Sequence, residues 1–191
     1  LVGSIYQAKD IVIDTMWLES LPKDHKINGM AEVIKMALIK GGKLYELVNS
    51  SNPDNWNNLK EIIELSANYK LQIIKDDLRD TNGERELLNL GHTWGHALEF
   101  SQEILHGFAV ADGIIEEMKY SNYYYGYPNL STMQQVLSLL KKWKLVEEDK
   151  NLSYANNNHG YKLLYFYLTK DKKSDRLVTL EYIGKAKIIT W

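Results

Sequence analysis

Hydrophobic residues recur at three- and four-residue steps through most of this chain, a spacing that predicts helices with one buried face. The first such stretch begins at Asn28 and is closed by Gly41 and Gly42. Its apolar positions are Met30, Val33, Ile34, Ala37 and Leu38. The same spacing predicts further helices over residues 53–75, 85–98, 109–125 and 132–142.

Both ends of the chain show strand patterns instead. Residues 10–15 are short and rich in β-branched side chains, which predicts a strand. No partner strand is predicted nearby, so we expect its neighbours in sequence that precedes Leu1. Residues 177–183 alternate and turn at Gly184 into residues 186–189, which predicts a hairpin, and residues 151–160 read as a polar loop. We therefore expect a mainly α, multi-helical domain with a short N-terminal strand and a small C-terminal hairpin.

The composition of the chain excludes some classes of partner and limits the residues that could bind a metal. The chain is 45% hydrophobic and 25% charged with a formal net charge of -2, which argues against a nucleic-acid partner. The sequence has neither a run of about 18 apolar residues nor a leader pattern, so we expect no membrane partner and a cytoplasmic location. Because the chain contains no cysteine, a transition-metal site would have to use histidine, carboxylate and water.

Three of the five histidines lie close together in the sequence. His92 and His96 are four positions apart, so on a helix both imidazoles would project from one face and could meet a metal or an anion. Two partly buried, hydrogen-bonded histidines are an equally open interpretation of this pair. His106 follows a predicted helix end, where the chain could fold it back to the same face. His25 and His159 have polar neighbours, which indicates surface positions.

A carboxylate would complete a catalytic zinc site, which commonly has three protein ligands and one open position. Glu32 is the best candidate because small and apolar residues surround it, and a buried acid needs a partner. The alternative is a buried salt bridge with Lys35, three positions further on. Cations that could hold phosphate or carboxylate are Lys70, Arg85, Lys172 and Lys173.

These segments together resemble 3-dehydroquinate synthase, and the likeness runs from Leu1 to the final hairpin. Residues 29–35 match the family's Gly-Met-Ala-Glu-Val-Ile-Lys signature, and residues 87–99 match its Leu-Leu-Asn-x-Gly-His-x-x-Gly-His signature. Asp171-Lys172-Lys173 matches a later one. The resemblance implies that residues 1–22 are the terminal segment of a missing NAD-binding α/β domain and that residues 23–191 form the helical domain that binds metal and substrate.

The resemblance also implies roles for individual residues. Glu32, His92 and His106 would bind Zn²⁺, for which Co²⁺ could substitute, while His96 would face substrate instead of metal. The residues that would contact substrate are Lys35, Lys70, Arg85, Asn89, His96 and Lys172. NAD would be held mainly by the domain that precedes Leu1.

The implied enzyme is a phosphate-eliminating carbon–oxygen lyase of the shikimate pathway, which serves aromatic amino acid biosynthesis. It converts 3-deoxy-D-arabino-heptulosonate 7-phosphate into 3-dehydroquinate through transient NAD-dependent oxidation, phosphate elimination, re-reduction and aldol closure. The partners implied are this phosphorylated sugar acid, the chain's own NAD-binding domain and a second copy in a homodimer. We expect the chain to be inactive without its NAD-binding half.

Several positions depart from the family pattern. Phe108 stands where the family usually has glutamate, which predicts a missing polar contact near His106. Asp24 and His25 replace an expected Arg-Glu pair, and Asp80 is an uncertain match for a family glutamate. Two alternatives stay open: a related sugar-phosphate cyclase or polyol dehydrogenase domain, and a helical interaction module that has lost catalysis.

Overall fold

The computed structural model describes residues 8–56, 58–76, 83–152 and 176–190, and only the backbone at residues 100–102. Its described elements are two 3₁₀ helices, six α-helices and one two-stranded antiparallel sheet. They are η1 (Thr15–Leu18), α1 (Lys23–Lys40), α2 (Gly42–Ser50), α3 (Leu59–Asp76), η2 (Arg85–Asn89), α4 (His92–Gln102), α5 (His106–Tyr125), α6 (Leu130–Lys142), β1 (Arg176–Tyr182) and β2 (Lys185–Thr190). The expected mainly α fold with a C-terminal hairpin is confirmed.

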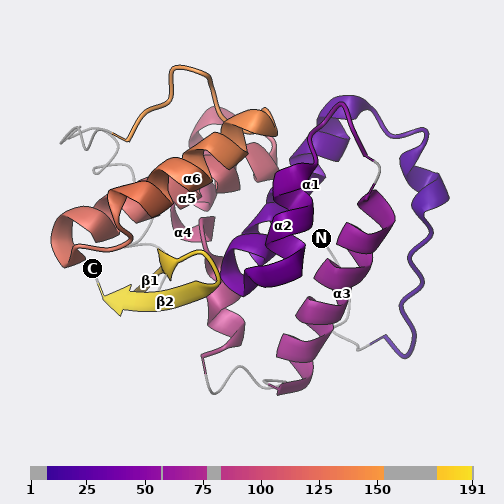
Figure 1. Cartoon of the computed structure of the whole chain (residues 1–191), viewed down its shortest axis with the longest axis horizontal. Coiled ribbons are helices and arrows are strands. Elements are labelled where there is room, and N and C mark those ends of the chain that lie inside the picture. Colours follow the sequence, from indigo (N-terminus) through magenta and orange to yellow (C-terminus); the bar gives the residue numbers. More distant parts are fainter. Residues whose placement is uncertain (1–7, 57, 77–82, 153–175, 191) are drawn as a thin grey trace.

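Helices α1 and α5 form the centre of the hydrophobic core. Ile34 and Leu38 of α1 and Ile114 and Met118 of α5 are completely buried. Helix α5 also packs against α4, α6 and β1, while α1 packs against α2, α3 and β2. In Figure 1, α6 and the hairpin lie on the left of the view and α3 lies on the right. The residues at the start of α4 and α5 are positioned by this shared core.

The hairpin is tied to the core by a backbone hydrogen bond. Strands β1 and β2 pair in antiparallel register, with Val178 opposite Ile188. At the turn between them, the N–H of Gly184 donates to the carbonyl oxygen of Leu38 in α1 at 2.8 Å. The predicted hairpin and its turn are therefore confirmed.

Helix boundaries differ from the prediction where local signals are weak. The first helix begins at Lys23 instead of Asn28, α2 was not predicted, and the next helix begins at Leu59 instead of Pro53. The helix predicted over residues 85–98 is divided into η2 and α4, because Gly91 between them has a φ of 78° that a helix cannot accommodate. The polar loop predicted over 151–160 lies almost entirely outside the described residues.

The strand predicted over residues 10–15 is not found. Residues 11–14 pair with no strand of the described chain, and Ile11, Val12 and Ile13 are 65%, 90% and 55% exposed. Asp14 instead caps η1, because its side chain accepts a hydrogen bond from the backbone N–H of Met16 at 2.9 Å. β-Branched residues form a strand only where a neighbouring strand satisfies their backbone groups.

Among the described residues, none of the helices combines the length and the apolar character that crossing a membrane would require.

Candidate active site

Three helices bring a carboxylate and two imidazoles to one point. Glu32 lies in the middle of α1, His92 is the first residue of α4, and His106 is the first residue of α5. The Oε1 atom of Glu32 lies 3.5 Å from Nε2 of His92 and 3.5 Å from Nε2 of His106. The three ligand atoms all lie within 4.8 Å of one another, so a single cation could contact all three.

The far nitrogen of each imidazole is held by an acceptor. Nδ1 of His92 lies 3.2 Å from the carbonyl oxygen of Leu90, and Nδ1 of His106 lies 3.1 Å from Oε2 of Glu99. An acceptor at Nδ1 favours the tautomer that is protonated there, which leaves the Nε2 lone pair directed at Glu32. Burial and, to a smaller extent, the nearby charge of Lys35 lower the pKa of His92 to about 4. The ring is therefore neutral at neutral pH, as a metal ligand must be.

The two oxygens of Glu32 have different surroundings. Oε2 accepts a hydrogen bond from Nζ of Lys35 at 2.7 Å, so the salt bridge considered from the sequence is present. Oε1 is buried and has no hydrogen-bond partner among the described residues. A buried carboxylate oxygen that faces two lone pairs is unfavourable unless a cation lies between them. The donor set of one oxygen and two nitrogens is one that Zn²⁺ or Co²⁺ accepts, so the residues present fit the metal.

The charge of Glu32 is maintained by its neighbour. Burial alone would raise the pKa of Glu32, but the ammonium group of Lys35 holds it below its ordinary value. Burial in turn lowers the pKa of Lys35, and Glu32 opposes that effect. The Lys35 side chain is 5% exposed and the Glu32 side chain is 39% exposed, so solvent reaches this charge pair from the side of Glu32.

His96 lies one turn further along α4 and does not join Glu32. Its ring centroid is 5.4 Å from that of His92 and 6.0 Å from that of His106, and the residue is exposed. The described ligand group around Glu32 contains His92 and His106, whereas a second group joins His96, Glu99 and His106. Helical spacing alone therefore did not identify the pair of histidines that faces the carboxylate.

A cavity of about 240 Å³ opens beside Glu32. Lys35 and Lys70 both line it, together with Ser66 and Leu88. Two of the predicted substrate contacts are thus brought to one cavity from α1 and α3. Arg85 and Asn89 are exposed residues at the two ends of η2, and Lys172 lies outside the described residues.

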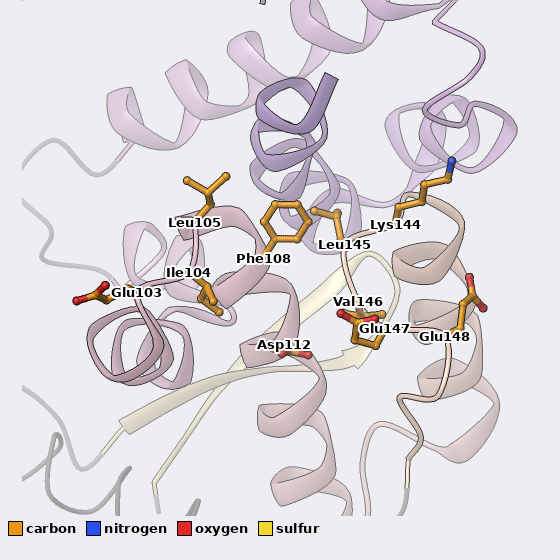
Figure 2. A pocket seen from close by; sticks show the side chains of 10 residues that line it. All are labelled: Glu103, Ile104, Leu105, Phe108, Asp112, Lys144, Leu145, Val146, Glu147 and Glu148. Atoms are coloured by element: carbon orange, nitrogen blue, oxygen red, sulfur yellow. The ribbon is translucent and has the colours of Figure 1, made fainter. Parts of the chain in front are cut away.

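The side chain of Phe108 does not line the cavity beside Glu32. Figure 2 shows its ring near Leu105 and Leu145, in a separate cavity of about 800 Å³. The polar contact to His106 that we expected to be missing is made by Glu99 from α4. Phe108 therefore does not leave His106 without a carboxylate partner.

Two further residues near the site were not predicted. Glu99 is the partner of His106, and Glu117 of α5 is fully buried and accepts hydrogen bonds from Gly91 and Trp94 at the start of α4. Burial raises the pKa of Glu117 to about 8, although these backbone N–H groups act in the opposite direction. The position of Glu117, three residues after Ile114 on the apolar face of α5, was the available sequence signal.

Comparison with known proteins shows what this arrangement resembles. The profile of the 3-dehydroquinate synthase C-terminal domain matches residues 29–174. A 3-dehydroquinate synthase of Sulfolobus acidocaldarius is 33% identical over 91% of this chain and 50% of the relative. One of Staphylococcus epidermidis is 32% identical over 97% of this chain and 52% of the relative. The chain thus spans about half the length of the curated relatives it matches.

Solved structures share the fold. A 2-deoxy-scyllo-inosose synthase superposes with a TM-score of 0.73 at 25% identity, covering 99% of this chain and 52% of that one. The 2-epi-5-epi-valiolone synthase of Streptomyces hygroscopicus, solved with NAD⁺ and Zn²⁺ bound, gives a TM-score of 0.73 at 18% identity and covers 93% of this chain and 50% of its own. The latter likeness establishes similarity of fold.

Proposed function

The chain belongs to the 3-dehydroquinate synthase family, and from this we propose that it is the metal- and substrate-binding half of a phosphate-eliminating cyclase that uses NAD. The observation that carries the proposal is the buried Oε1 atom of Glu32, which faces Nε2 of His92 and of His106 and has no hydrogen-bond partner among the described residues. We propose these three residues as the ligands of Zn²⁺, with Co²⁺ as a substitute.

The residues around the proposed ligands orient them for metal binding. A bound Zn²⁺ would supply Lewis acidity that lowers the pKa of substrate hydroxyls. Leu90 and Glu99 hold the two imidazoles in the tautomer that binds metal, and Lys35 orients the carboxylate of Glu32 through its other oxygen. The chain thus provides a site whose ligands are oriented before substrate arrives.

The cavity beside Glu32 is the proposed substrate site. Lys35 and Lys70 line it, so it suits an anionic group of a phosphorylated sugar acid. Arg85, Asn89 and Lys172 are proposed as further contacts to carboxylate, hydroxyl or phosphate groups. We propose that His96, which is exposed next to His92, moves a proton to or from bound substrate. The substrate that we propose is 3-deoxy-D-arabino-heptulosonate 7-phosphate, with NAD bound by sequence that this chain does not contain.

A second candidate is a related sugar-phosphate cyclase with a substrate that lacks the carboxylate. The likeness to 2-deoxy-scyllo-inosose synthase favours it, because that structure matches this chain over nearly its whole length. Another solved 2-deoxy-scyllo-inosose synthase contains carbaglucose-6-phosphate, NAD⁺ and Co²⁺. The two candidates share a phosphate and differ in the substrate carboxylate, so ligand competition distinguishes them.

Metal analysis of the chain, purified without a histidine tag, tests the metal centre. We expect about one zinc per chain, its loss in His92→Ala, and its retention in His25→Ala, which removes an exposed histidine of α1. Zinc that stays in His92→Ala, or no zinc in the unmodified chain, would contradict the proposed ligands.

Calorimetric titration of the zinc-loaded chain tests the substrate. We expect 3-deoxy-D-arabino-heptulosonate 7-phosphate to bind more tightly than carbaglucose-6-phosphate, and Lys70→Ala to weaken both because it removes a cavity cation. The reverse order of affinities would favour the second candidate.

A further inference from the structure

The start of α4 is capped by a residue from a different helix. The N-cap residue of α4 is Gly91, which has no side chain to accept hydrogen bonds from the first turn. Instead, the N–H of Gly91 donates to Oε2 of Glu117 at 2.6 Å, and the N–H of Trp94 donates to Oε1 at 3.3 Å. A single carboxyl group of α5 therefore satisfies backbone donors that a local Ser, Asp or Asn ordinarily satisfies.

The burial of Glu117 is explained by its hydrogen bonds to the start of α4. The residue is completely buried, and burying a carboxyl group is unfavourable unless it forms hydrogen bonds. The hydrogen bonds that Glu117 forms with described residues go to the backbone of α4, with a further electrostatic contribution from Lys35. An apolar residue at this position would fill the core but would leave the first turn of α4 without acceptors.

The backbones of α4 and α5 are in close contact at the start of α4. A Cβ atom added to Gly113 of α5 would lie 2.0 Å from the carbonyl oxygen of Gly91. Gly91 itself has a φ of 78° and lies against Val110 and Ile114. The start of α4 is thus pressed onto α5 at the level where Glu117 accepts its hydrogen bonds.

This contact is one residue away from a proposed metal ligand. His92 follows Gly91 directly, and its Nδ1 atom is held by the carbonyl oxygen of Leu90. The imidazole is therefore fixed relative to the backbone of residues 90–92, and a shift of that backbone moves Nε2 by a similar amount. Metal–ligand distances tolerate only about 0.2 Å of change.

We propose that Glu117 is a positioning residue that seats the start of α4 on α5 and thereby directs the imidazole of His92 toward Glu32 and His106. The role rests on the metal centre proposed above. Glu117 touches neither the metal nor the substrate in this role, and it acts through the backbone of Gly91 and Trp94.

The visible absorption spectrum of the Co²⁺-loaded chain tests the role, because it reports the geometry of the ligands and does not depend on turnover. Co²⁺ affinity and the urea stability of the metal-free chain are measured beside it. The variants are Glu117→Ala, which removes both acceptors, and Glu117→Gln, which keeps the shape and one acceptor. The matched control is Glu116→Gln, which removes the neighbouring acid of α5 and its ion pair with Lys119 at 2.9 Å.

We expect Glu117→Ala to bind Co²⁺ about tenfold more weakly with an altered spectrum, and Glu117→Gln to show a smaller change in the same direction. Glu116→Gln should keep the wild-type spectrum and affinity, even if it is less stable. If Glu117→Ala does not fold, Glu117→Gln decides the matter.

Wild-type spectrum and affinity in the folded Glu117 variants would overturn the positioning role, because reduced stability alone is what a merely structural residue would show. An unmodified chain that binds no Co²⁺ would instead overturn the metal centre on which the role depends.

Discussion

The contact between Gly107 and Asn28 sets the distance between two proposed metal ligands. The N–H of Gly107 at the start of α5 donates to Oδ1 of Asn28 in α1 at 2.7 Å. A Cβ atom added to Gly107 would lie 2.0 Å from the backbone oxygen of Asn28, whereas ordinary contact begins at 3.4 Å. Gly107→Ala must therefore separate α1 from α5 locally by roughly 1.4 Å, the difference between these two distances.

The separation acts on stability and on the metal site together. Overpacking of this kind destabilises a fold by about 1 to 3 kcal/mol. It also moves His106, next to Gly107, away from Glu32, whose Oε1 now lies 3.5 Å from its Nε2. Since ligand distances tolerate about 0.2 Å, we expect zinc affinity to fall at least about tenfold.

Gly29→Ala is the matched control. Gly29 lies in α1 next to Asn28, and a Cβ atom added there meets nothing within 4 Å. Alanine at a compatible helical position should stabilise the chain by about 0.4 to 1 kcal/mol and leave zinc affinity unchanged. Urea denaturation of the metal-free proteins and zinc competition with a chromophoric chelator measure both effects.

A Gly107→Ala protein with wild-type stability and zinc affinity would refute this reasoning. It would show that α1 and α5 adjust to one another without moving the ligands.

Two further predictions concern buried groups. The pKa of Glu117 is raised to about 8 from 4.5, so between these values the folded state holds a proton that the unfolded state has lost. The free energy of unfolding of the metal-free chain, measured relative to that of Glu117→Gln, should therefore fall as pH rises from 5 to 8, by at most about 1.4 kcal/mol per pH unit. Urea titrations in which the difference between the two proteins does not change with pH would contradict this prediction. Trp143→Phe removes the hydrogen bond from Nε1 to the Val48 carbonyl oxygen at 3.2 Å. We therefore expect thermal or urea unfolding to show a free energy of unfolding that is lower by about 1 to 3 kcal/mol. An unchanged free energy of unfolding would be inconsistent with that bond.

Much of the helical architecture followed from local pattern. The apolar spacing within α1, α5 and α6 predicted those helices, and the alternation around Gly184 predicted the hairpin. These are properties of neighbouring residues, so a sequence carries them directly. The strand predicted over residues 10–15 was wrong for a related reason. A strand needs a pairing partner that can lie far away in the sequence, and local pattern does not show whether that partner is present.

The chemistry of the site was determined only in part by sequence. Residue types and the family signatures identified Glu32, His92, His96 and His106 as candidates, but helical spacing paired His92 with His96. The family resemblance implied Glu32, His92 and His106 as the ligands, and the tertiary structure brings these three side chains together from the middle of α1 and the starts of α4 and α5.

The roles of the supporting residues became visible only in the fold. Glu99 resembles an ordinary helical acid in the sequence, and Glu117 is marked there only by its place on an apolar helix face, yet one holds the His106 ring and the other caps α4 from α5. The close approach of Gly107 to Asn28 joins positions that are 79 residues apart. Local sequence determines which residues can form a helix or bind a cation, whereas packing between distant backbones determines which of them meet, because those contacts exist only after the core has formed.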